Sequence, residues 1–184
     1  MRLTFRIRHR YPGRAVHEEK LVVATEHGEM PWHIALKLLA YLRFIDHRPQ
    51  IEKRVGGRYK PDLVDVDDRG RVRLWIECGN IGPRKIASVA RRVAREDGRF
   101  IILKRHRGEV TALARLLDGR VATGTVDLLA FDDHFVDRMT AVLDANNTMD
   151  CTLSEAGGRE RLHLMVDNRH GRTELQTEIV SHAL

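Results

Sequence analysis

The sequence has few cysteines and no long apolar run, and both shortages exclude classes of protein. Its 184 residues include two cysteines, Cys78 and Cys151, which form no CxxC pair. This excludes a disulfide scaffold and a zinc site built from cysteine pairs, and a reducing cytoplasm is the expected location. No apolar stretch approaches the length of a membrane span, and residues 1–6 lack the apolar core of a signal peptide. We therefore expect a cytoplasmic protein that makes no membrane contact.

Repeats, low-complexity tracts and linker-like stretches are also absent. The composition, 42% hydrophobic and 32% charged residues, is typical of a globular protein with a core of ordinary size. We expect one α/β domain over residues 1–184, with residues 171–184 extended or frayed at its end. The paired glycines fit turns, and no phosphate-binding loop pattern is present.

The net charge of +6 hides an asymmetry along the chain. Residues 1–130 carry 27 Lys and Arg against 16 Asp and Glu, whereas residues 131–184 carry 5 against 10. The basic part suits a polyanionic partner such as nucleic acid. Two alternatives stay open: the arginines cover solvated faces without a ligand, or the acidic C-terminal region binds another protein.

The hydrophobic pattern predicts a mixed central sheet with flanking helices and a C-terminal hairpin. A strand, a helix that begins at Pro83 and a second strand follow one another over residues 72–103, which requires parallel pairing of the two strands. A later helix is expected to take Asp132 as its N-cap. The other predicted elements are strands at 2–9, 20–25, 63–66 and 125–131, helices at 31–46 and 110–117, and a closing hairpin of 147–154 with 161–166.

Two carboxylates meet at one end of a predicted hairpin. The apolar strands 63–66 and 72–78 flank the polar turn 67–70, which is typical of an antiparallel pair. Asp62 opens the first strand and Glu77 closes the second, so the pairing brings both side chains to the same end. Two converging carboxylates suit a hard cation such as Mg²⁺. The alternative is that Asp62 is a turn residue and Glu77 a solvated strand end.

Several segments carry a family resemblance, and the most specific of them runs from Leu74 to Gly79 (Leu-Trp-Ile-Glu-Cys-Gly). Together the segments resemble the bacterial YaeQ family, over most of residues 1–170. The order of elements resembles the core of the PD-(D/E)xK, or restriction-endonuclease-like, superfamily. The other matching segments are 34–42, 61–62, 84–86, 132–133 and 148–153.

The resemblance implies a variant restriction-endonuclease-like core whose acidic site consists of Asp62 and Glu77. The backbone carbonyl of Cys78 would help these carboxylates to hold Mg²⁺ or Mn²⁺. The superfamily pattern places a lysine two residues after the second acid, and this chain has Gly79 there. Lys85, in the first turn of the following helix, is the expected substitute because an ammonium can act as a relocated point charge.

The resulting hypothesis is a metal-dependent nuclease. Arg84, Arg91 and Lys104 are expected to contact the phosphates of DNA or RNA, and Glu29, near the start of the first helix, is either a capping carboxylate or an accessory acidic group. The alternative is a catalytically degenerate nuclease fold, kept as a nucleic-acid-binding or regulatory module. The sequence does not choose between DNA and RNA, and it does not give the oligomeric state.

Overall fold

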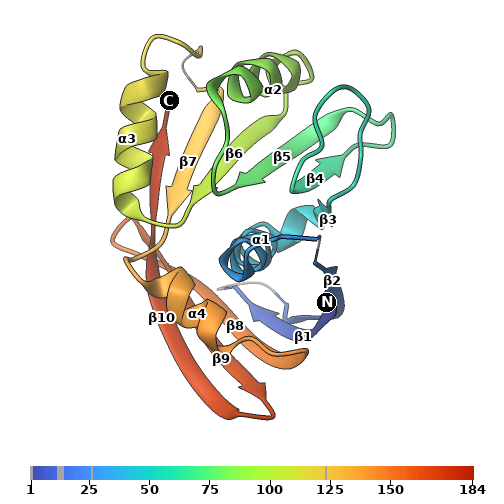
Figure 1. The fold of residues 1–184 in the computed structure, drawn as a ribbon, viewed down its shortest axis with the longest axis vertical. Helices are drawn as coiled ribbons and strands as arrows, with labels where there is room; N and C mark the ends of the chain where they lie inside the picture. The colour runs from blue at the N-terminus through green and yellow to red at the C-terminus, as the bar shows by residue number, and fades with distance from the viewer. Residues whose placement is uncertain (1, 12–14, 26, 123) are drawn as a thin grey trace. The chain divides into compact units, whose positions relative to one another are not determined.

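The computed structural model describes residues 2–11, 15–25, 27–122 and 124–184, and the chain forms two compact units (Figure 1). The first unit consists of Met1–Ala35 and Phe131–Val180, and the second of Leu36–Ala130 and Ser181–Leu184. Each unit has its own set of paired strands. The single domain expected from the sequence stays a prediction.

The first unit contains five strands of a mixed sheet, in the order β2-β1-β8-β9-β10. Strands β1 and β8 are parallel, and the other neighbours are antiparallel. Leu3, Phe5 and Ile7 are buried on one face of β1, as the alternation of the sequence predicts. The elements are β1 (Arg2–Arg10), β2 (His17–Ala24), α4 (Phe135–Val142), β8 (Asn146–Ala156), β9 (Arg159–Asn168) and β10 (Gly171–Ala183).

The predicted role of Asp132 as a helix cap is wrong. Helix α4 begins three residues later, and its N-cap position is taken by His134, which has a left-handed backbone with a φ of 64°. The Asp132 carboxylate instead accepts the backbone N–H of Glu178 at 2.8 Å and the hydroxyl of Thr177 at 3.2 Å. The short polar side chain therefore ties the start of this segment to β10.

The C-terminal residues form a strand, β10. Residues 171–184 were expected to be either extended or frayed, and the structure shows them extended. Strand β10 pairs antiparallel with β9 and places Leu175 opposite Leu164. Leu175, Thr177 and Ile179 alternate as buried residues, which is the pattern of a strand with one wet face. The last residues belong to the second unit, where the Leu184 N–H donates to the carbonyl of Val126 at 3.0 Å.

The second unit contains the strands in the order β3-β4-β5-β6-β7. Strands β4 and β5 form the predicted antiparallel hairpin, and β5, β6 and β7 are parallel, which confirms the mixed α/β class. The elements are α1 (Pro31–Arg43, of this unit from Leu36), a 3₁₀ turn at Ile45–His47, β3 (Gln50–Ile51), β4 (Leu63–Val66), β5 (Val72–Cys78), α2 (Pro83–Arg95), β6 (Arg99–Lys104), α3 (Arg107–Leu117) and β7 (Val126–Ala130).

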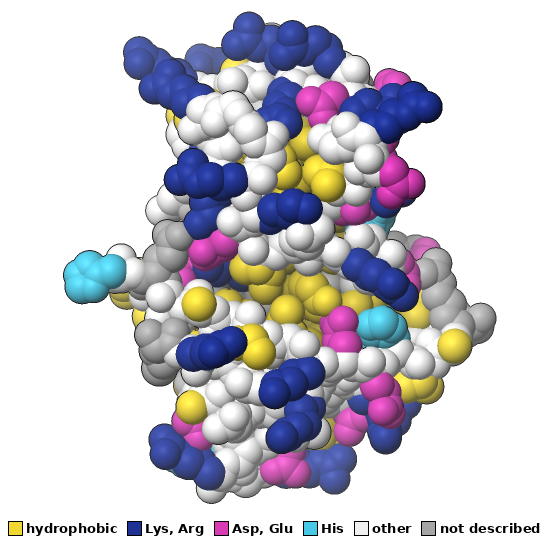
Figure 2. Space-filling view, turned by 90° about the vertical axis from the view of Figure 1, so that its right-hand side faces the viewer, with side chains coloured by type: hydrophobic (Ala, Val, Ile, Leu, Met, Phe, Trp, Pro, Cys, Tyr) yellow, Lys and Arg dark blue, Asp and Glu magenta, His cyan; other side chains and the backbone are white. Residues whose placement is uncertain are grey.

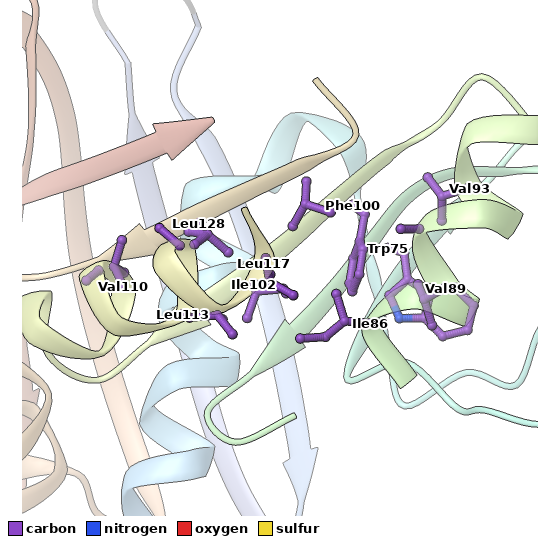
Figure 3. Close-up of a cluster of buried hydrophobic side chains, with 14 of the residues drawn as sticks. Trp75, Ile86, Val89, Val93, Phe100, Ile102, Val110, Leu113, Leu117 and Leu128 are labelled. Atoms are coloured by element: carbon purple, nitrogen blue, oxygen red, sulfur yellow. The ribbon is translucent and has the colours of Figure 1, made fainter. Parts of the chain in front are cut away.

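The core of this unit lies between the sheet and the helices α2 and α3. Figure 3 shows Trp75 of β5 beside Ile86 and Val89, which come from the apolar side of α2. Gly98 lets the chain return from α2 to the sheet, because a Cβ there would lie 2.4 Å from the carbonyl oxygen of Val72. None of the helices in the described part of the chain is long and apolar enough to span a membrane.

Candidate active site

The hairpin brings Asp62 and Glu77 to the same end, as its register requires. Leu63 pairs with Ile76, so the preceding residue, Asp62, continues the register opposite Glu77. The Asp62 N–H donates to the carbonyl of Ile76 at 3.1 Å. The Asp62 carboxylate accepts the backbone N–H of Cys78 at 2.7 Å, which fixes it against the end of β5. The two acidic side chains predicted from the sequence are therefore neighbours.

Glu77 is a buried carboxylate with two side-chain donors. Its side chain is inside the unit, with 4% of the residue exposed. The indole Nε1–H of Trp75 donates to one oxygen at 2.7 Å, and the Lys85 ammonium donates to the other at 2.6 Å. Burial raises the pKa of the Glu77 carboxyl, and the nearby Asp62 charge raises it further, while Lys85 and Trp75 act in the opposite direction.

Lys85 reaches this carboxylate from the first turn of α2. Pro83 begins the helix, and its fixed φ suits the first helical position. The Lys85 ammonium also donates to the carbonyl of Lys60 at 3.3 Å and lies 5.9 Å from the centre of the Tyr59 ring. It thus links α2, the end of β5 and the residues just before Asp62.

The chain at Gly79 has left the strand conformation. Its φ is +76°, and its N–H donates to the carbonyl of Leu103 on β6 at 2.8 Å. Lys104, predicted to contact phosphate, is buried and donates to the carbonyl of Gly79 at 2.9 Å. The structure therefore places the Lys104 ammonium beside the backbone at residue 79, and not on the solvent-facing surface.

The other predicted residues lie in two places. Arg84 and Arg91 are exposed on α2, in the same unit as the two carboxylates. Glu29 belongs to the first unit, where its carboxylate bonds Nδ1 of the His33 ring at 2.7 Å. Within that unit Glu29 thus contacts a side chain in the first turn of α1, and its accessory role stays a prediction.

An ion network close to Asp62 was missed in the sequence. The Glu52 carboxylate lies between the ammonium groups of Lys37 and Lys60, and one of its oxygens is 3.1 Å from the Lys60 ammonium. The Lys37 side chain is fully buried. Burial would raise the pKa of Glu52, but the hydrogen bonds and charges of the two lysines outweigh it and lower the pKa. The Glu52 N–H donates to the carbonyl of Asp62 at 2.7 Å. The available signal was Lys37 itself, which falls three residues after Ile34 on the apolar side of its helix.

The metal ligands predicted at the end of the hairpin are oxygen atoms, the ligand type that hard divalent cations bind. They are the carboxylates of Asp62 and Glu77 and the backbone carbonyl of Cys78, whose N–H already faces Asp62. Mg²⁺ takes one or two carboxylates and keeps several water ligands, so a larger protein ligand set is not required. Among the residues that the structure describes there is no group of three or more His, Cys, Asp or Glu able to hold a metal ion.

The fold and the site together define a mixed α/β protein in which a hairpin and the following helix assemble an acidic pair with a lysine. The YaeQ protein family model matches residues 12–176, and the chain belongs to this family. It is similar to the crystal structure of the YaeQ protein from Xanthomonas axonopodis pv. citri, with 16% identity, a TM-score of 0.68 and coverage of 97% of this chain and 98% of that chain. The YaeQ protein from Pseudomonas syringae is similar too, with 17% identity, a TM-score of 0.67 and coverage of 96% and 93%. A search of curated proteins found no match.

Proposed function

We propose that the end of the β4–β5 hairpin and the start of α2 form a variant PD-(D/E)xK site that hydrolyses phosphodiester bonds of nucleic acid with Mg²⁺ or Mn²⁺. One observation carries this proposal: the Lys85 ammonium lies 2.6 Å from an oxygen of the Glu77 carboxylate. Glu77 in turn lies opposite Asp62 in the hairpin. Two acids and one lysine are thus present, although the lysine comes from the helix and not from residue 79.

Each residue has a distinct role in this proposal. Asp62, Glu77 and the Cys78 carbonyl would hold the cation, which when bound would lower the pKa of a ligated water and neutralise charge that develops on the phosphate. Trp75 holds the Glu77 carboxylate in one orientation through its indole N–H. Lys85 would orient the attacking water by hydrogen bonding, since an ammonium offers three rotatable donors. Arg84 and Arg91, which are exposed, stay candidates for the flanking phosphates, and Glu29 for an accessory group. Lys104 is buried against the carbonyl of Gly79, so it would have to leave this contact to reach a phosphate.

A second candidate function is a nucleic-acid-binding module without catalysis. The same ion pair favours it, because Lys85 already neutralises Glu77 and lies where a cation would approach that oxygen. In this case the buried pair would be a structural link between β5 and α2. The two functions differ in one measurable property, the affinity of the end of the hairpin for a divalent cation.

The test is calorimetric titration of Mg²⁺ and of Mn²⁺ into the wild type and into an Asp62→Asn/Glu77→Gln variant. Asp68→Asn, which alters an exposed carboxylate in the turn of the same hairpin, is the matched control. We expect binding in the wild type and the control and none in the double variant. The next step is a cleavage assay with duplex and single-stranded DNA and RNA. Equal metal binding by all three proteins, or none by the wild type, would overturn the metal-dependent mechanism.

A further inference from the structure

The described surface has basic side chains around hollows in both units, but the charges around these hollows differ. In the first unit a hollow of about 500 Å³ lies over β1, β2 and β8. Its three cations are matched by three carboxylates, and the Arg8 guanidinium is already 2.7 Å from Glu18. The charged lining residues are Arg6, Arg8 and Lys20 with Glu18, Glu19 and Asp150. Such a balanced surface does not favour a polyanion.

The hollows beside α2 are different, because every charged residue that lines them is an arginine. The first, of about 340 Å³, has alanines of α2 along its floor and is bordered by Arg91 and Arg120. The second, of about 490 Å³, is bordered by Ser88, Arg91 and Arg95. Among the residues that the structure describes, no carboxylate lines either hollow, so the charged lining of both hollows is positive.

The outward side of α2 is opposite its buried side. At 100° per residue, Arg84, Ser88, Arg91 and Arg95 fall within about 60° of one another on the helix. The buried residues of α2 centre on the far side, about 180° away; they are Ile86, Val89, Ala90 and Val93. In the upper part of Figure 2, where Figure 1 places α2 and the β4–β5 hairpin, many Lys and Arg side chains lie on the surface, with Asp and Glu side chains among them.

Two guanidinium groups on this side, those of Arg91 and Arg95, bond the helix backbone and not a carboxylate of the described residues. Arg91 and Arg95 donate their Nε–H to the backbone carbonyls four residues earlier, at 3.1 and 3.2 Å. Their Nη groups are left for an external acceptor, and within the described residues no carboxylate bonds them. Arg92 differs, because Glu96 and the carbonyls of residues 55 and 56 take its donors.

We propose that the outer side of α2, formed by Arg84, Ser88, Arg91 and Arg95, binds the phosphate backbone of a nucleic-acid duplex. This inference rests on the proposed function, because the same helix carries Lys85. The side spans about 16 Å from Arg84 to Arg95 at 1.5 Å per residue, so it would hold the duplex that flanks the bond to be cut. Contacts to phosphate carry no sequence information, so binding is sequence-independent.

The chemistry of the surface favours a duplex over two other polyanions. In the described part of the chain no aromatic residue lines the hollows of α2, and single-strand sites use aromatic rings to stack unpaired bases. A basic helix that inserts into an anionic membrane carries large apolar side chains beside its basic residues. The large hydrophobic residues exposed in the described parts of the chain are Val16, Met30 and Leu116, and none of them belongs to α2.

The experiment measures the salt dependence of binding to a fluorescent mixed-sequence DNA duplex in EDTA, where no metal-dependent cleavage occurs. The test variant is Arg84→Ala/Arg91→Ala/Arg95→Ala. The matched control is Arg6→Ala/Arg8→Ala/Lys20→Ala, which removes the same charge from the balanced hollow. If all three α2 arginines contact phosphate, the slope of log K against log salt falls in magnitude by about 2.7 in the test variant.

The control is expected to keep the wild-type slope, and so is a variant with lysine at all three α2 positions, which retains the charge. Equal slopes for test and control variants would overturn the proposal, as would tighter binding of the single strand than of the duplex. Binding to phosphatidylserine vesicles but not to DNA would overturn it too. A wild type that binds the duplex but never cleaves it would refute the nuclease proposal and leave this one standing.

Discussion

Replacing Lys85 by Met removes one of the two side-chain donors of a buried carboxylate while keeping most of the apolar stem. Glu77 would then rely on the Trp75 indole alone. Removing one partner from a buried pair costs about 3–5 kcal/mol of unfolding free energy. The Glu77 side chain is 5% exposed but that of Lys85 is 25% exposed, so we expect the lower end, about 3 kcal/mol at pH 8.

This loss depends on pH, because the variant can protonate Glu77. The Glu77 pKa is raised above its ordinary value of 4.5 in the folded protein, and losing Lys85 raises it further. A raised carboxyl pKa contributes stability that is fully present below the unfolded-state value and is lost as pH rises through the folded-state value. Within that window each pH unit changes the unfolding free energy by about 1.4 kcal/mol. The variant should therefore be closer to the wild type at pH 5 than at pH 8.

The assay is urea unfolding at pH 5 and pH 8, followed by the fluorescence of Trp75 and Trp32. Lys53→Met, at an exposed position with no ion pair among the described residues, is the control and should stay within about 0.5 kcal/mol of the wild type. Adding Glu77→Gln to Lys85→Met should recover most of the loss at pH 8, since no buried charge is left. A loss that is equal at both pH values and is not recovered would refute the ion pair as its cause.

Two further changes test other parts of the structure. Glu52→Gln removes the carboxylate between Lys37 and Lys60 and should lower the unfolding free energy by about 3 kcal/mol at pH 7. Because the Glu52 pKa is lowered in the folded protein, the difference between variant and wild type should shrink as pH falls below 4.5. Urea unfolding at pH 7 and pH 3.5 would measure this change. Ile179→Ala should lower the unfolding free energy by about 2 kcal/mol if β10 is part of the core. Gln176→Ala, on the exposed face of the same strand, should stay within about 0.5 kcal/mol of the wild type. Equal effects of the two variants in thermal unfolding would contradict the buried position of Ile179.

The parts of the site that could be predicted from the sequence depend on local pairing. Asp62 and Glu77 are fifteen positions apart, and a short turn joins the two strands that carry them. The alternation of these two strands was therefore enough to place the two residues together. The start of α2 was equally accessible, because Pro83 marks it and the apolar residues that follow repeat at helical spacing. These signals lie within the element that they describe.

The parts that were missed depend on contacts between distant segments. Nothing in the sequence near Asp132 indicates that its carboxylate accepts hydrogen bonds from Thr177 and Glu178 of β10, about 45 residues later in the chain. Likewise, the Lys37–Glu52 pair joins α1 to the end of β3, and each residue alone is an ordinary surface residue type. The sequence did not predict β10 as a paired strand, because polar and charged residues alternate with its buried ones. These residues hide the short alternation of Leu175, Thr177 and Ile179.

The glycine at residue 79 suits the backbone there, which has left the strand conformation. A φ of +76° lets Gly79 donate to Leu103 and offer its carbonyl to Lys104. An L-residue in this conformation costs about 1–2 kcal/mol, and a side chain at 79 would no longer alternate with Glu77 along the strand. A cation for Glu77 must therefore come from another element, and the first turn of α2 is the one that supplies it. Gly79 and Lys85 are linked features of one backbone path, and we expect that a Gly79→Lys change alone would not place an ammonium group beside Glu77.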